Sequence, residues 1–374
     1  MRSVSCHIVA VLLRAGLLVL AIGLFAGSSM AQWIVKSEDG KASLKLGLLL
    51  QGRADWSKIE DLDPISQNFS IRRARILLGG QINPRVGFFF DTDSPNLGRV
   101  PAQESLKSYG GQYVQDFVAT MTVNDMLQMD GGLILVPTSY NHLQSAATLL
   151  ALDYGPFTFA ESDPMQEKVG RDSGLQARGV LGPKLVEYRL GAFQGVRGQG
   201  DANSLRTTAR VSLHPFGTAG KGLFYTGNGF GKTRVLSLGA AADLQKDYSS
   251  IHGDIYVEAP VAVGSCVTFQ GDVSNYDGGD LLAGLPKQVT YLAEGGIGFL
   301  LNRLSAYAQV AVRDYDSEEK SDETNLQFGL AGYLDGHRST LKLAIDRRSF
   351  DAPKGGTAPP SSTGVTLQYQ VFYF

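Results

Sequence analysis

Short runs in which apolar and polar side chains alternate recur through most of this chain. The clearest run spans residues 339–348, where Leu341, Leu343 and Ile345 alternate with polar neighbours such as Lys342. A period of two is that of a β-strand with one apolar and one polar face. Because Gly, Pro, Asn and Asp separate runs of about ten residues, the pattern predicts an all-β protein with many strands.

The alternation predicts about sixteen strands. They are expected near residues 43–56, 69–82, 85–93, 113–123, 127–136, 171–181, 184–195, 205–214, 233–243, 250–259, 263–274, 289–300, 304–315, 324–333, 339–349 and 364–374. Short connectors follow most even-numbered strands and long ones follow odd-numbered strands, as in outer-membrane barrels. The exceptions are the long, Gly-rich segment 215–232 and the short segment 244–249. Either a folded-back turn or a missed strand explains them, which leaves strand counts of 14 and 18 open.

Two architectures fit many short alternating strands. A soluble β-sandwich needs two apolar inner faces, but polar residues fill one face of most of these strands. A transmembrane barrel needs that distribution, because its apolar face contacts lipid while closure satisfies every backbone group. The sequence therefore predicts an all-β, transmembrane antiparallel β-barrel. The long third loop, 137–170, is expected to fold into the lumen.

The first 31 residues have the organisation of a secretory signal peptide. Arg2 and Arg14 precede an apolar core of about twelve residues, and small residues lead to Ala31. We expect cleavage there, which divides the chain into a signal segment, 1–31, and an outer-membrane barrel, 32–374. No later segment has the ~18 consecutive apolar residues of a spanning helix. The exported chain keeps Cys266 alone, so an intrachain disulfide is excluded.

Composition narrows the class of function. The chain has 45 Gly among 374 residues, which disfavours a largely helical fold. Its net charge is -2 and it lacks a basic run, so nucleic acid is not an expected partner. Neither a G-x-S-x-G setting nor an H-E-x-x-H or C-x-x-C motif occurs. The sequence therefore predicts no enzyme activity, no catalytic residues, no metal and no cofactor.

Several segments carry a resemblance to a known family. Phe69 to Gly79, with Asn83-Pro84 and Phe88 to Asp91 after it, resembles the second and third strands of the phosphate-selective porin O and P family. The segments at 131–137 and 171–179 resemble that family's fifth strand and sixth strand, with its long third loop between them. The resemblance implies a sixteen-stranded barrel that is usually a homotrimer, and a preference for phosphate. Terminal Phe374 fits the pattern read by the barrel assembly machinery, although the apolar alternation before it predicts a position just beyond the ladder.

The strand parity that faces water gives a predicted pore lining. The basic residues that we expect to contact solute are Lys45, Arg53, Arg73, Arg75, Arg206, Arg210, Lys342 and Arg348. The acidic residues of the constriction loop are Asp153, Glu161, Asp163 and Glu167. Arg72 has the opposite parity and is expected to lie at the membrane interface or to snorkel.

These charges predict a transverse field across a wet constriction that sorts small polar or charged solutes, with anions following the basic strip. The competing interpretation makes Arg72, Arg73 and Arg75 structural partners of Asp91 and Asp93 on the next strand. The expected function is a passive diffusion channel in the outer membrane, in contact with its lipid. The alternative is an outer-membrane barrel with a structural or adhesive role and no channel.

Overall fold

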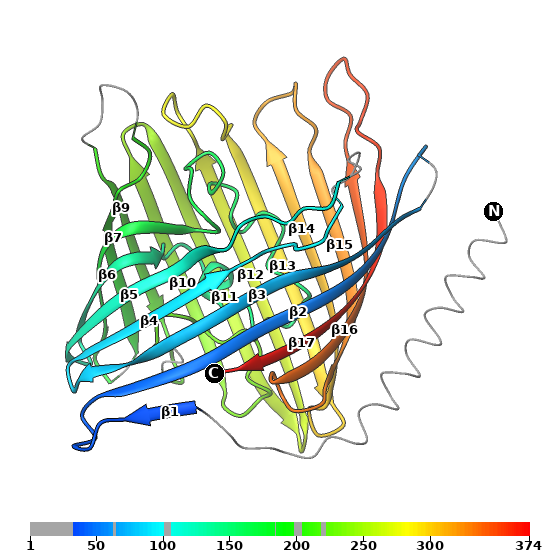
Figure 1. Ribbon diagram of the computed structural model, residues 1–374. Helices are drawn as coiled ribbons and strands as arrows, with labels where there is room; N and C mark the ends of the chain where they lie inside the picture. Colours follow the sequence, from blue (N-terminus) through cyan, green and yellow to red (C-terminus); the bar gives the residue numbers. More distant parts are fainter. Residues whose placement is uncertain (1–32, 63–64, 101–105, 184, 198–203, 218–221) are drawn as a thin grey trace.

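The structure is a computed structural model that describes residues 33–62, 65–100, 106–183, 185–197, 204–217 and 222–374. The expected signal segment, 1–31, lies outside the described residues. Within them, sixteen antiparallel strands, β2 to β17, form a closed barrel, because each pairs with the next and β17 pairs with β2 (Figure 1). The strands are β2 (Ser43–Ile59), β3 (Ser66–Asn83), β4 (Val86–Asp93), β5 (Tyr113–Asn124), β6 (Leu127–Leu135), β7 (Arg171–Leu181), β8 (Val186–Phe193), β9 (Arg206–Leu213), β10 (Val235–Gln245), β11 (Tyr248–Ala262), β12 (Ser265–Asp277), β13 (Gln288–Phe299), β14 (Leu304–Tyr315), β15 (Glu323–Tyr333), β16 (Ser339–Phe350) and β17 (Ser362–Tyr373).

The predicted barrel is confirmed, and each expected strand overlaps an observed one. Two short elements were not expected: strand β1 (Trp33–Lys36) and helix α2 (Tyr140–Leu143). Strand β1 pairs with residues 43–46 of β2, next to the point where the pairing of β17 with β2 ends (Figure 1). Among the described residues, no helix is long and apolar enough to cross a membrane.

The alternation of β2 illustrates why these residues form a barrel wall. Leu46, Leu48 and Leu50 are each more than a third exposed, whereas Leu49 and Gln51 between and beside them are buried. Successive side chains of a strand point to opposite faces. The apolar face of the strand therefore lies on the outside of the barrel, and its other face points into the lumen.

The connectors divide the barrel into two rims. The turns after β3, β5, β7, β11, β13 and β15 are short and form what we call the turn rim, together with the longer connector 214–234 between β9 and β10. Most connectors at the opposite rim, the loop rim, are long (Figure 1). The exception is the two-residue turn Lys246-Asp247. The described part of the connector 214–234 contains no strand and folds back into the lumen. The count of sixteen strands therefore holds.

A β-bulge changes the direction of Arg72. Gln51 of β2 pairs with Arg73, but the next residue, Gly52, pairs with Ile71, so Arg72 is an extra residue in β3. A bulge re-aims the side chain of its extra residue. The expectation that Arg72 lies at the membrane interface is therefore wrong, because its Nε donates to loop residue Asp153 inside the barrel at 2.8 Å.

Candidate functional site

Loop 3, residues 136–170, folds into the barrel and lies on the inward faces of the strands. Its short helix α2 is capped at the N-terminus by Ser139, whose hydroxyl accepts a hydrogen bond from the His142 amide. The four residues of this helix are buried, and most of the segment from 143 to 157 is buried with them. Its position agrees with the expectation that the third loop narrows the lumen.

The wall formed by β16, β17 and β2 holds the middle of loop 3 through main-chain contacts. Lys342 Nζ donates to the carbonyl oxygens of Leu149 and Ala151, each at 2.6 Å. Beside it, Gln370 donates to the Ala147 carbonyl at 2.9 Å. Because Lys342 is only 6% exposed, its charge is used to seat the loop rather than to face open water.

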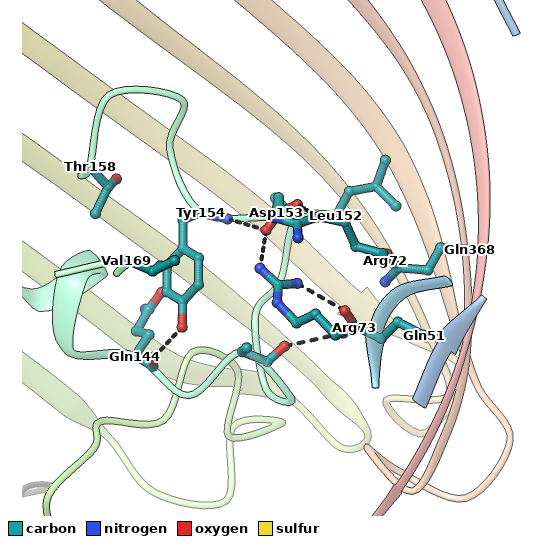
Figure 2. Close-up of polar contacts among 12 residues, drawn as sticks. Gln51, Arg72, Arg73, Gln144, Leu152, Asp153, Tyr154, Thr158, Val169 and Gln368 are labelled. Carbon is teal, nitrogen blue, oxygen red and sulfur yellow. Dashed lines mark hydrogen bonds and ion pairs between the residues drawn. The ribbon is translucent and has the colours of Figure 1, made fainter. Parts of the chain in front are cut away.

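Three guanidinium groups converge on one loop carboxylate, and Figure 2 shows the contact that Arg73 makes with it. Asp153 accepts hydrogen bonds from Arg53 at 3.1 Å and from Arg72 at 2.8 Å, and it pairs with Arg73. Gln51 fixes Arg73 from the other side by accepting a hydrogen bond at 2.8 Å. Burial would raise the pKa of Asp153, but the three arginines hold it well below its usual value. We call these four charged residues, Arg53, Arg72, Arg73 and Asp153, the arginine cluster.

The arginine cluster is partly accessible and carries an excess of positive charge. The side chains of Asp153 and Arg72 are 27% and 23% exposed, whereas that of Arg73 is 3% exposed. Three positive charges against one negative charge favour an anion at the exposed side. Asp55 and Asp346 lie farther along the same wall toward the loop rim and are partly buried. The entrance therefore presents both signs of charge, with the arginines closest to loop 3.

The opposite wall holds loop 3 through buried ion pairs. Arg206 donates to Asp243 at 2.6 Å and to loop residue Glu167 at 2.5 Å. Arg210 pairs with Asp254 through two hydrogen bonds, at 2.6 and 2.9 Å, and its Nη1 also donates to the loop carbonyl of Thr138. Both arginines are at most 1% exposed. They therefore anchor the loop from the side opposite Lys342.

The remaining predicted residues have separate roles. Arg75 pairs with Asp91 and Asp93, as the cross-strand interpretation holds, whereas Arg72 and Arg73 bind Asp153 instead. Lys45 lies over the ring of Phe374, and Arg348 pairs with Glu323 near the loop rim. Within loop 3, Glu161 lies buried 3.4 Å from His142, and Asp163 is exposed. The structure thus brings Arg53, Arg73 and Asp153 together and separates them from Lys45 and Arg348. Phe374 itself follows the last paired residue of β17, as expected.

Sequence reasoning missed a second segment inside the lumen. Residues 222–231 of the connector contact loop 3 through two backbone hydrogen bonds, Tyr225 N to Leu143 O at 2.8 Å and Ser145 N to Tyr225 O at 2.9 Å. The available signal was the length and composition of the connector. The eighteen residues 215–232 are more than a tight turn needs, and they include Phe224, Tyr225 and Phe230. Large aromatic side chains in such a connector indicate burial.

Comparison with solved structures supports the fold. The anion-selective porin from Comamonas acidovorans superposes with a TM-score of 0.56 at 14% sequence identity, covering 89% of this chain and all of that chain. The outer-membrane channel DcaP of Acinetobacter baumannii gives a TM-score of 0.56 at 12% identity, covering 90% and 99%. The trimer form of OmpT, an outer-membrane protein of Vibrio cholerae, gives 0.55 at 10% identity, covering 89% and 100%.

At the sequence level, no family model matches the chain, and no curated protein matches it. The structural neighbours cover nearly the whole barrel, but their identities are low. Such a likeness establishes architecture rather than solute or selectivity. The chain has the sixteen-stranded β-barrel fold of the outer-membrane porins.

Proposed function

We propose that this protein is a porin of the bacterial outer membrane, a passive diffusion channel for small polar or charged solutes. The apolar exterior and polar interior of the closed barrel support a membrane location. Loop 3 supports a channel role, because it narrows the lumen from fixed points on two walls. In this orientation the turn rim faces the periplasm and the loop rim faces the outside.

The channel is proposed to prefer anions, phosphate among them, through the arginine cluster. The observation that carries this proposal is the convergence of Arg53, Arg72 and Arg73 on a single carboxylate, Asp153. Arginine presents a planar fork that matches the oxygens of phosphate or carboxylate. Two further points agree: the resemblance of residues 69–91 to the phosphate-selective porin O and P family, and the anion selectivity named for the Comamonas acidovorans porin.

The proposal includes a homotrimer and assembly through the C-terminal strand. The Vibrio cholerae protein with this barrel forms a trimer, which supports but does not establish the same state here. For assembly, the outward residues Val365, Leu367 and Tyr369 supply the alternation of β17, and Phe374 follows it. Recognition by the barrel assembly machinery is expected to use this strand. Native electrophoresis of the detergent-extracted protein tests the trimer.

The reversal potential of single channels in a KCl gradient tests the anion preference. The wild type should reverse toward the chloride potential, and R53Q/R72Q should shift the reversal toward the potassium potential. K354Q removes one positive charge from an exposed loop and serves as the control. Adding phosphate to one side should reduce the chloride current of the wild type more than that of R53Q/R72Q. Cation preference in the wild type overturns the anion proposal.

One observation favours the alternative of a barrel without a channel. Inward residues on both walls, among them Arg206, Arg210 and Lys342, are buried by segments that enter the lumen. Such burial is also compatible with a structural or adhesive barrel. Liposome swelling with small sugars separates the two, because swelling supports the porin and its absence from correctly folded protein supports the alternative.

A further inference from the structure

Residues 222–231, which we call the crossing segment, traverse the barrel from one wall to the other. At its start, Phe224 packs edge-on against Phe89 of β4, with ring centroids 5.4 Å apart. Toward its end, the Gly229 and Gly231 amides donate to Glu258 of β11, each at 2.6 Å. Six strands separate β4 from β11 on one side of the ring and eight on the other. Contacts with nearly opposite walls require the segment to span the lumen.

The crossing segment is fixed along its whole length. Arg189 of β8 donates to the carbonyls of Gly222 and Leu223, at 3.2 and 3.0 Å. At the other end, Asn228 donates to the Tyr333 hydroxyl of β15 at 2.9 Å. Arg189 is 1% exposed and Asn228 is 1% exposed. The segment is therefore part of the packed interior rather than a loosely placed loop.

A stack of three tyrosines joins the crossing segment to loop 3 and to the wall. Tyr140 of loop 3 lies between Tyr256 of β11, with centroids 4.1 Å apart, and Tyr225 of the crossing segment, at 4.7 Å. The Tyr256 hydroxyl donates to the Gly227 carbonyl at 2.6 Å, and the Gly227 amide donates to Thr148 of loop 3 at 3.0 Å. The crossing segment is thus held directly against loop 3 and the β11 wall.

Glycine permits the close approach of the crossing segment to its neighbours, most clearly at Gly227. A Cβ atom on Gly227 would lie 2.7 Å from the Thr148 carbonyl oxygen, and one on Gly229 would lie 2.8 Å from Glu258. At Gly227 the neighbour is backbone that cannot easily move, so a side chain there is excluded, whereas at Gly229 the Glu258 carboxylate would have to shift. The glycine-rich character of the connector is explained by this close approach of its backbone to loop 3 and to a wall carboxylate.

A cavity opens on the turn-rim side of the crossing segment. It has a volume of about 600 Å³ and is lined by Phe230 and Lys232 together with Arg303, Asp335 and His337 of two neighbouring turns. The crossing segment contacts loop 3 through Tyr225 and lines this cavity through Phe230. The crossing segment therefore lies between loop 3 and the turn-rim cavity.

We propose that residues 222–231 form a second constriction element, which sets the conductance and size limit of the channel together with loop 3. The proposal rests on the channel function proposed above. The two elements enter the lumen from opposite ends of the barrel, because loop 3 is a connector of the loop rim and the crossing segment belongs to a connector of the turn rim. The residues that determine its effect are Leu223, Phe224, Tyr225 and Phe230, which supply its bulk.

The test compares single-channel conductance and sugar permeability of variants in planar bilayers and liposomes. The first variant replaces residues 216–233 with Gly-Ser-Gly. This is a feasible turn, because Leu213 and Leu238 already face each other on paired strands. The second, F224A/Y225A/F230A, keeps the chain length. F216A is the control, since Phe216 is in the same connector but is 63% exposed. Heat-modifiable electrophoretic mobility verifies that each barrel has folded.

A second constriction in series predicts that both lumen variants conduct at least about twofold more than the wild type and admit larger sugars, while F216A does not change. If the wild type conducts and the folded lumen variants conduct equally well, the proposal is overturned and the porin function stands. If neither the wild type nor the folded variants conduct, both proposals are overturned. A silent wild type with conducting variants supports the crossing segment as the element that closes the barrel.

Discussion

The ammonium group of Lys342 in β16 donates a hydrogen bond to the carbonyl oxygen of Leu149, 193 residues earlier in the chain. The contact joins the barrel wall to the middle of loop 3, and a second hydrogen bond to Ala151 reinforces it. A buried cation held by two carbonyl groups fixes both the position of the loop and its backbone conformation. This arrangement gives the first of four predictions.

Replacing Lys342 with methionine should loosen loop 3. The substitution removes two charge-assisted hydrogen bonds and leaves two buried carbonyls without their donor, which should cost about 1–3 kcal/mol. The measurements are the free energy of unfolding in detergent and the rate of proteolysis within residues 143–157. K41M, in an exposed turn, is the matched control and should change neither. Unchanged protection of the loop in K342M contradicts the anchoring role.

Replacing Asp153 with asparagine should increase anion preference. The change removes the single carboxylate of the arginine cluster and leaves the charges of its three guanidinium groups without that partner beside the partly accessible entrance. The reversal potential in a KCl gradient should therefore move closer to the chloride potential. D163N removes an equal charge from an exposed position of the same loop and should have a smaller effect. Equal shifts in both variants contradict a local role of Asp153.

Replacing Arg206 with methionine should strongly destabilise the barrel. Arg206 is fully buried and pairs with Asp243 and Glu167, so its loss leaves two uncompensated carboxylates. Removing one member of a buried ion pair typically costs about 3–5 kcal/mol. R347M, which breaks an exposed pair with Glu60, should cost much less. Denaturant unfolding of both variants in the same detergent compares them directly.

Conductance should rise at acidic pH through His337. Burial under Phe230 lowers the pKa of His337 to about 4, the hydrogen bond to the Asn228 carbonyl raises it, and nearby Lys342 and Lys232 lower it. If the crossing segment detaches, the exposed imidazole regains a pKa near 6.5. Between pH 6.5 and 4 the detached state therefore binds one more proton than the docked state. As the pH falls, the ratio of detached to docked protein rises by up to about tenfold per pH unit.

The measurement is conductance of the wild type and H337N between pH 7 and pH 5. The asparagine variant cannot take up the proton and should lose most of the dependence on pH. A pH response of equal size in both proteins would assign the effect to other groups.

The barrel could be predicted from local patterns because the alternation of each strand is a local property. Leu341, Leu343 and Ile345 mark the outward face of β16 without reference to any other strand. The inward positions of Lys342 and Arg206 follow from the same parity. The contacts that those side chains make do not follow from it, because loop 3 is brought to them by the fold.

The direction of Arg72 and the position of the crossing segment could not be predicted from the sequence, for different physical reasons. The direction of Arg72 depends on a one-residue bulge, and strand periodicity gives no sign of where an extra residue is placed. The consecutive Arg72 and Arg73 were a usable hint, because one of them would otherwise face lipid. The crossing segment lacks periodicity altogether, and its place is determined by partners such as Glu258 and Tyr140 that are distant in sequence.

Leu213 pairs with Leu238, and the described residues of the connector 214–234 take no part in the pairing of β9 or β10 with a neighbouring strand. Insertions, deletions and substitutions in that intervening stretch can therefore accumulate while the register of every strand is preserved. Under the proposed channel function, a lineage carrying this barrel can adjust what it admits by changing this one connector. The paired strands and the segment proposed to govern passage are free to evolve at different rates.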